Sequence, residues 1–442
     1  MSRYMTRSDT VKVVISQMVL AFALRLPAAG EPAQTNLVPE IKVAGDRTEG
    51  VYKVGEKVRF KIETIKPELA AADAKTARYA LRLNNHSNIT NGTFDIVSGK
   101  EVEYEFKKPG WALLSVTPKW KDADGRAVII MAGAMCEPEK IRPGEEMPAD
   151  FQAFWNEKKK ILDAMPFEPE LTPVTNMTSE KVETYAIVLN NINGTKIRGF
   201  FAKPKGDGKF PAFMQVNAAG VYSVGPSLVS GYAAKGAMAI HINAHDIPNG
   251  QPKEFYEQLK LNDYPTRGRN SREESYFLRM FCSCYRAAQY LAGRNEWDGR
   301  HFMVSGSSQG GGQAFVTASL CPKVTAFAAN VPALCDHGGR EAGRQAGWPG
   351  WVVYGKDGKP EMASLEASRY YDCANFARSI KAKGLVSAGF IDCCCPPCSV
   401  YAAFNMLPGD KKIVNMVATG HGMSPECNRE FDRFINEELG LK

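Results

Sequence analysis

The sequence predicts a chain of two parts, an all-β region followed by an α/β region with a mostly parallel sheet. Short runs of alternating polar and apolar residues fill residues 41–136, whereas strands of the buried type alternate with helical segments after residue 148. A third observation locates the centre of the second part: Gly306-x-Ser308-x-Gly310 follows an apolar strand and precedes a helix.

Length and charge agree with this division. At 442 residues the chain exceeds the usual size of one domain, and 44% hydrophobic with 23% charged residues is ordinary for a globular protein. The net charge of +7 comes from scattered Lys and Arg, without a long basic run or an RNA-binding signature. We therefore expect a mildly basic surface and no nucleic-acid partner.

The first 30 residues resemble a secretory signal. Basic residues precede an apolar run, Val13–Leu24, and the small residues of Pro27–Gly30 provide a cleavage region. The run is too short to span a bilayer, so we expect a secreted or periplasmic protein with no membrane span. Arg25 shortens the apolar core, and a disordered or wrongly started N-terminus is the alternative.

Residues 38–137 are predicted to form a small antiparallel, immunoglobulin-like β-sandwich. Val58, Phe60 and Ile62 alternate with charged residues, and turn signals recur about every ten residues. This domain could act as a spacer, cover the second domain or bind polysaccharide, and the sequence does not choose among these roles. A Pro-containing linker, 138–148, separates it from the second domain, 149–442.

The second domain alternates strands with helices. This order predicts an open sheet that is covered on both faces, with its ligand site at the C-terminal ends of the strands. The predicted elements are a hairpin (182–189 and 196–203), buried strands (212–216, 237–242, 302–304, 385–390 and 413–417) and helices (232–235, 274–294 and 429–439).

Gly306-x-Ser308-x-Gly310 is typical of the nucleophile elbow of the α/β-hydrolase fold. Glycines at both ends remove the Cβ atoms that would collide where strand and helix close on one another. The turn would expose the Ser308 hydroxyl and leave the Gln309 N–H free to meet a developing oxyanion.

A serine nucleophile needs a histidine base, and the base needs a carboxylate. In this fold the acid and then the histidine follow the serine, which leaves His337 and His421 as candidates. His421 is preferred because it follows the strand 413–417. Asp392 directly follows the strand 385–390 and is preferred as the acid over three other carboxylates, Asp357, Asp372 and Asp410.

The second oxyanion donor is expected from the loop after an early strand. Small residues, 217–221, follow the strand 212–216 and let a backbone amide, that of Gly220 or Val221, approach the substrate oxygen beside that of Gln309. A tight turn without this role is the alternative.

The chain has eleven cysteines, six of them in the last seventy residues. Cys395 and Cys398 form a Cys-x-x-Cys that could be a redox pair or half of a metal site. An isolated disulfide, or small buried side chains, is the preferred interpretation. We predict no metal site and no cofactor.

Several motifs resemble the acetyl xylan esterase and cephalosporin C deacetylase family of α/β-hydrolases over residues 148–440. They are Pro148–Phe151 with Trp155, Cys284–Ala288, Gly306–Gly312, Val331–Asp336, Gly389–Asp392 with Pro396-Pro397, Tyr401–Asn405 and Gly420-His421. The chain is most similar to secreted, polysaccharide-degrading members with an N-terminal β domain. The resemblance implies Ser308 as nucleophile, Asp392 and His421 as its partners, no cofactor, and removal of acetyl groups from xylan or xylo-oligosaccharides.

The sequence also departs from the family. Many family members carry Arg-Gly-Gln where this chain has Asn243–Pro248. After the histidine they commonly carry an acidic residue, where this chain has Gly422, and beside the acid they carry more polar residues than Cys393–Cys395. These departures leave the substrate and the possibility of a homo-oligomer open. The alternatives are another hydrolase of this fold, acting on other esters or peptides, and a carbohydrate-binding protein with an inactive hydrolase domain. A redox function of Cys395 and Cys398 is a third alternative.

Overall fold

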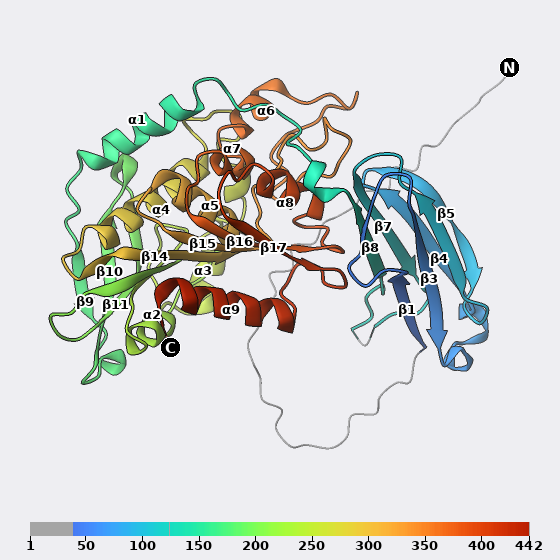
Figure 1. Ribbon diagram of the computed structural model, residues 1–442, viewed down its shortest axis with the longest axis horizontal. Coiled ribbons are helices and arrows are strands. Elements are labelled where there is room, and N and C mark those ends of the chain that lie inside the picture. Colours follow the sequence, from blue (N-terminus) through green and yellow to red (C-terminus); the bar gives the residue numbers. More distant parts are fainter. Residues whose placement is uncertain (1–38, 123, 442) are drawn as a thin grey trace. The chain divides into compact units, whose positions relative to one another are not determined.

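The computed structural model describes residues 39–122 and 124–441 (Figure 1). The predicted signal segment, 1–30, lies outside the described residues. No helix in the described part of the chain is long and apolar enough to cross a membrane.

The N-terminal region forms two sheets, as predicted. One sheet has the antiparallel order β1 (Glu40–Gly45), β3 (Lys57–Ile65) and β6 (Lys100–Glu105). The other has the order β2 (Val51–Tyr52), β8 (Ile130–Cys136), β7 (Gly110–Thr117), β4 (Thr76–Leu83) and β5 (Ser87–Asp95), in which only the β2–β8 pair is parallel. Val58, Phe60 and Ile62 of β3 point into the shared core, as their alternation predicts.

The second region contains a nine-stranded mixed sheet. Its order is β17 (Lys411–Met416), β16 (Lys383–Gly389), β15 (Ala326–Asn330), β14 (Trp297–Ser307), β12 (Phe210–Gln215), β13 (Met238–Ile242), β11 (Lys196–Pro204), β10 (Val182–Asn190) and β9 (Glu170–Pro173). The strands from β17 to β13 are parallel, and the predicted β10–β11 hairpin continues the sheet antiparallel. The parallel strand ends therefore meet at one edge, as the fold requires of a ligand site.

Helices cover both faces of this sheet (Figure 1). The helices α2 (Ser227–Ala234) and α9 (Pro425–Leu439) pack on one face. The other face carries α1 (Phe151–Asp163), α4 (Tyr276–Ala292), α5 (Gln309–Leu320), α7 (Cys373–Ala377) and α8 (Pro397–Phe404). The same region contains two short helices, α3 (Lys253–Gln258) and α6 (Met362–Ser368). This is the predicted α/β-hydrolase-like architecture.

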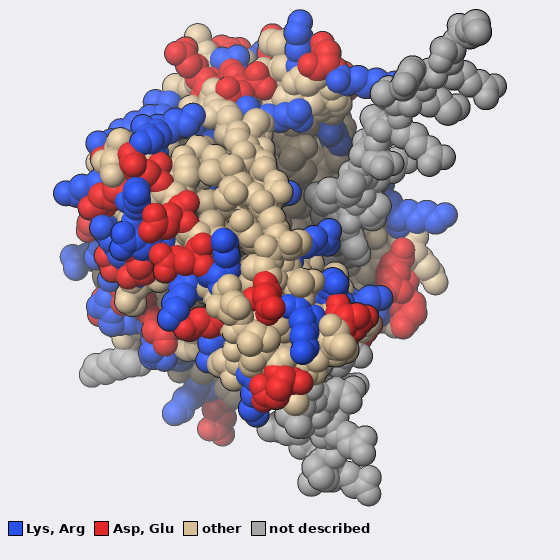
Figure 2. All heavy atoms as spheres, turned by 90° about the vertical axis from the view of Figure 1, so that its right-hand side faces the viewer, with Lys and Arg blue, Asp and Glu red and all other residues tan. Residues whose placement is uncertain are grey.

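Charges of both signs share the surface. On the face drawn in Figure 2, Lys and Arg lie interspersed with Asp and Glu. In the β1–β3–β6 sheet, for example, Arg59 and Lys57 both pair with Glu103, at 2.6 and 3.7 Å. This mixture agrees with the scattered basic residues of the sequence.

Strand β7 is buried on both faces, which the alternation in the sequence did not indicate. Ala112 and Leu114 face the core between the two N-terminal sheets, whereas Trp111 and Leu113 belong to the core of the α/β region. The Trp111 indole N–H donates to the Phe390 carbonyl oxygen at 2.8 Å. The β region thus packs against the segment that immediately precedes Asp392.

We expect Trp111→Ala to lower the free energy of unfolding by about 3–5 kcal/mol, because it removes a fully buried aromatic side chain. Chemical denaturation measures this. Trp120→Ala is the matched control, since Trp120 is only partly buried and packs within the β region. Equal losses for the two variants would contradict a special role of Trp111 between the two regions.

Candidate active site

Ser308 occupies the turn between β14 and α5. Its backbone is strained, with φ 56° and ψ −121°, a conformation that non-glycine residues rarely adopt. A Cβ atom on Gly306 would lie 2.3 Å from the Gly310 carbonyl oxygen, so only glycine permits this approach. Backbone hydrogen bonds to the end of β15 and the loop after it hold the turn: Ser308 N–H donates to the Asn330 carbonyl oxygen at 2.9 Å, and Ala333 N–H donates to the Ser308 carbonyl oxygen at 2.9 Å. The predicted elbow is therefore formed.

The three residues that the sequence singled out come together at the strand ends. His421 Nε2 lies 2.9 Å from Ser308 Oγ, and His421 Nδ1 lies 2.8 Å from Asp392 Oδ2. Asp392 follows β16, and His421 follows β17, the next strand of the sheet. This geometry allows a proton to pass from Ser308 to His421 while Asp392 holds the imidazole.

The loop that carries Asp392 wraps around its carboxylate. The side chain is fully buried, and Oδ1 accepts the N–H groups of Cys394 at 2.7 Å and Cys395 at 2.9 Å. A Cβ atom on Gly389 would lie 2.5 Å from the Gly420 carbonyl oxygen, so the acid loop and the histidine loop are in close backbone contact. The acid is thereby fixed relative to the base.

Charges near His421 determine its protonation. Partial burial lowers the pKa of His421, but the hydrogen bond to Asp392 and the neighbouring Cys394 thiol outweigh this effect and raise the pKa above its ordinary value. Conversely, a hydrogen bond from Cys395 and the proximity of His421 lower the pKa of Cys394, against the effect of burial. Cys394 thus favours the protonated imidazole.

The loop after β12 lies against the first turn of α5. A Cβ atom on Gly310 would lie 2.7 Å from the Val216 carbonyl, and Gln313 Nε2 donates to the Asn217 carbonyl at 2.8 Å. Within the described residues, the amides of Gln309 and Val221 donate to no protein group, whereas Gly220 N–H lies 3.4 Å from the Tyr264 hydroxyl. The assignment of these three amides as oxyanion donors stays a prediction.

A buried aromatic network, not identified from the sequence, supports this loop. The Tyr264 hydroxyl donates to Gln309 Oε1 at 2.5 Å and faces Gly220 N–H. His245 Nε2 contacts the Gly220 carbonyl at 3.0 Å, and its Nδ1 contacts the Tyr276 hydroxyl at 2.8 Å. Burial lowers the pKa of His245 to about 4, so the ring is neutral. The sequence offered one signal, since His245 lies in the segment that departs from the family.

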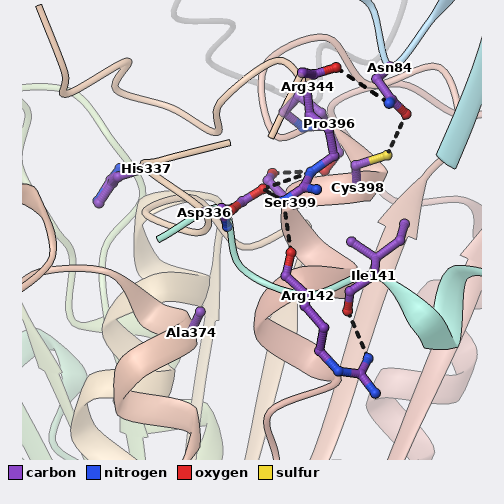
Figure 3. A network of polar contacts seen from close by, with 12 residues as sticks. Asn84, Ile141, Arg142, Asp336, His337, Arg344, Ala374, Pro396, Cys398 and Ser399 are labelled. Atoms are coloured by element: carbon purple, nitrogen blue, oxygen red, sulfur yellow. Dashed lines mark hydrogen bonds and ion pairs between the residues drawn. The ribbon is translucent and has the colours of Figure 1, made fainter. Parts of the chain in front are cut away.

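The β region also reaches the acid loop through a second set of polar contacts. Asn85 Nδ2 donates to Gln345 Oε1 at 2.6 Å, and Gln345 Nε2 donates to the Cys393 carbonyl, one residue after the acid. Figure 3 shows the neighbouring contact, in which Asn84 faces Cys398, with Sγ and Oδ1 3.4 Å apart. Both asparagines lie in the turn between β4 and β5.

A buried ion pair stabilises the loop that carries Gln345. Arg344 pairs with Asp336 at 2.8 Å and donates to the Arg142 carbonyl at 2.8 Å (Figure 3). Gly144 N–H donates to the same carboxylate at 2.7 Å. The segment predicted as the linker is therefore attached to the α/β region beside this loop.

The alternative candidates lie elsewhere. His337 is fully buried beside Trp351, and burial lowers its pKa to about 4. Asp372 accepts the N–H groups of Asp336, His337 and Ala374, so it has a structural role at the start of α7. Neither is hydrogen-bonded to Ser308.

All eleven cysteines are free thiols in the structure. Nine of them are buried, Cys394 is partly buried and Cys393 is exposed. The disulfide interpretation is therefore wrong, and the interpretation as small buried side chains holds for both Cys395 and Cys398. Cys394, Cys395 and His421 are close enough together to hold a metal ion.

Comparison with known proteins now identifies the family. Residues 131–437 match the model of the acetyl xylan esterase (AXE1) family. The chain belongs to this family. Acetyl esterase Axe7A of Xylanibacter ruminicola is 30% identical over 297 residues, which cover 66% of this chain and 67% of that protein. Membership makes the chain a carboxylic ester hydrolase of the acetyl esterase type.

Two solved structures share the fold. The acetyl xylan esterase from Paenibacillus sp. R4 is 23% identical in sequence and has a TM-score of 0.58. The matched part covers 68% of this chain and 98% of the Paenibacillus chain. Acetyl xylan esterase 1 from Thermoanaerobacterium sp. JW/SL YS485 is 22% identical with a TM-score of 0.59, with the same coverage. The shared part corresponds to about two thirds of the chain.

We expect Tyr264→Phe to lower kcat for an acetyl ester about tenfold, less than the loss of a direct oxyanion donor, because it leaves Gln309 and the Gly220 loop without their shared partner. Steady-state kinetics measure this. Tyr290→Phe is the control, since its hydroxyl contacts Arg294 at the far end of α4. Unchanged kcat in Tyr264→Phe would contradict a positioning role.

We expect Cys394→Val to move the acid limb of the kcat/KM–pH profile to lower pH. Without the thiolate the pKa of His421 falls, so the neutral imidazole that acts as a base is available at lower pH. Cys393→Ser is the control, because Cys393 is exposed and contacts Met131. A limb that stays in place, or moves to higher pH, would contradict the assigned effect of Cys394.

Proposed function

We propose that this member of the family is a serine esterase that removes acetyl groups from acetylated carbohydrate, with xylan or xylo-oligosaccharides as the expected substrates. The observation that carries the proposal is the continuous hydrogen-bonded series Ser308–His421–Asp392 at the strand ends. The names of the matched family and of its relatives support an acetyl ester as substrate.

The proposed reaction starts at Ser308. His421 Nε2 takes the Ser308 proton as the serine oxygen attacks the acetyl carbonyl. Asp392 accepts the hydrogen bond of His421 Nδ1–H, which keeps the Nε2 lone pair directed at the serine and stabilises the imidazolium. The backbone N–H groups of Gln309 and of the 220–221 loop stabilise the negative charge on the carbonyl oxygen by hydrogen bonds.

The acyl-enzyme is then hydrolysed by the same groups. His421 returns the proton to the sugar oxygen, which leaves as a hydroxyl, and a water molecule takes its place. His421 takes a proton from this water as the water oxygen attacks the acetyl carbonyl, and it returns the proton to Ser308 Oγ as the bond to the acyl group breaks and acetate leaves. The chain's own residues supply each proton transfer in this scheme.

Two alternatives are separated by substrate choice. A hydrolase of the same fold that acts on longer esters or peptides would turn these over at rates comparable to acetyl esters, because fold does not determine the leaving group. A carbohydrate-binding protein with an inactive domain would bind saccharide without releasing acetate. The intact hydrogen bonds among Ser308, His421 and Asp392 favour catalysis over the second alternative.

We expect Ser308→Ala to lower acetate release by at least about 10⁴-fold, since it removes the nucleophile and leaves only binding and oxyanion stabilisation. Acetate is measured with acetylated xylan, a peracetylated simple sugar and a small acetyl ester. Ser307→Ala is the control, because the Ser307 hydroxyl accepts a hydrogen bond from Asn330 Nδ2 and is not hydrogen-bonded to His421.

Release from all three substrates in wild type and in Ser307→Ala, lost in Ser308→Ala, is the expected result. Retained release in folded Ser308→Ala would refute the assignment of the nucleophile. Faster hydrolysis of longer esters than of acetates by the wild type would refute the assignment of the substrate.

A further inference from the structure

Two thiols that neither transfer a proton nor form a bond in the proposed reaction converge on the proposed catalytic histidine. Cys394 Sγ, Cys395 Sγ and a ring nitrogen of His421 all lie within 4.8 Å of one another. The proposed mechanism needs the backbone N–H groups of both cysteines, which bind Asp392, but it does not need their sulfur atoms. The side chains therefore require a separate explanation.

The shape of the acid loop explains why the thiols lie together. Because Asp392 Oδ1 accepts consecutive N–H groups, residues 392–395 turn around the carboxylate, and both side chains lie on the side of His421. Cys395 is fully buried, Cys394 is partly exposed, and the His421 side chain is 34% exposed. An ion from solvent can thus approach past Cys394 and His421.

We propose that Cys394, Cys395 and His421 form a binding site for a thiophilic divalent transition-metal ion of the zinc class. Thiolate sulfur and imidazole nitrogen are the ligands that zinc prefers, whereas magnesium and calcium prefer oxygen. Tetrahedral zinc holds its sulfur and nitrogen ligand atoms about 4 Å apart. Side-chain movements of about 1 Å therefore suffice to bring the three ligand atoms to zinc-binding distances.

The second shell of this site is already present. Asp392 accepts the hydrogen bond of His421 Nδ1, the carboxylate–histidine arrangement that directs a ligating imidazole toward a metal through Nε2. Three protein ligands leave a fourth position for water. Asp392 therefore orients the His421 imidazole in the same way for either of two alternative partners of Nε2, the Ser308 proton or a metal ion.

The consequence, which rests on the proposed function, is reversible inhibition by metal. The Nε2 lone pair that would accept the Ser308 proton, at 2.9 Å, is the one that would bind the ion. An occupied site therefore removes the base, and a chelator restores it. Metal binding itself does not depend on Ser308.

The test measures binding directly, with Co²⁺ as a spectroscopic probe of the reduced full-length chain. Thiolate ligands give cobalt a charge-transfer absorption, and a zinc competition then reports the affinity for Zn²⁺. Four proteins are compared: wild type, Ser308→Ala, Cys394→Val and Cys393→Ser. Cys393 is the matched control because it neighbours the cluster and contacts Met131 instead.

We expect one cobalt ion with thiolate charge transfer in wild type, Ser308→Ala and Cys393→Ser, and at least about tenfold weaker binding in Cys394→Val. Zn²⁺ should inhibit wild type and Cys393→Ser, reversibly by chelator, while Cys394→Val should need at least about tenfold more Zn²⁺ for the same fractional inhibition. Absence of the thiolate band in wild type, or equal affinity in Cys394→Val, would overturn the proposal.

The two proposals fail separately. Binding in inactive Ser308→Ala supports the metal site whatever the reaction, and a wild type that binds cobalt but releases no acetate would refute only the esterase. Equal inhibition of wild type and Cys394→Val by Zn²⁺ would place the inhibitory ion elsewhere and overturn the metal site.

Discussion

The proposed active site depends on one buried carboxylate. A charge without access to solvent is stable only if it is fully hydrogen-bonded, and Asp392 meets this condition through His421 and two backbone N–H groups of its own loop. The orientation of His421, and with it the direction of the lone pair toward Ser308, follows from where this loop holds the acid. Loss of the loop's conformation would therefore disable the base without altering any of the three side chains.

The N-terminal β region contributes to holding that loop. Trp111 binds the carbonyl of Phe390, two residues before the acid, and the Asn85–Gln345 pair reaches the carbonyl of Cys393, one residue after it. Of the three roles that the sequence left open, covering the α/β region agrees best with these contacts. The residues that connect the two regions contact the same loop system through Asp336 and Arg344.

Much of the site could be predicted because its signals are local. The glycines around Ser308 predict a strained turn, and Asp392 follows closely after the buried strand β16. His421 follows β17, which was predicted as a buried strand but lies half-exposed at the edge of the sheet, with only Met416 buried. Other features depend on contacts between distant segments. Strand β15 is short and rich in alanine, so its place in the sheet depends on its neighbours. Strand β7 shows no alternation because the α/β region covers its outer face. The support of the loop by Tyr264 and His245, and the approach of two thiols to His421, likewise require the folded chain.

Covalent labelling tests the central claim most directly. A serine-reactive fluorophosphonate probe is added to the full-length protein, and the modified peptide is identified by mass spectrometry. The elbow geometry and the contact with His421 predict a single adduct on Ser308, with labelling lost in His421→Gln, which lacks the base. Labelling of another residue, or undiminished labelling of Ser308 in His421→Gln, would contradict the assignment of Ser308, His421 and Asp392 as one catalytic unit.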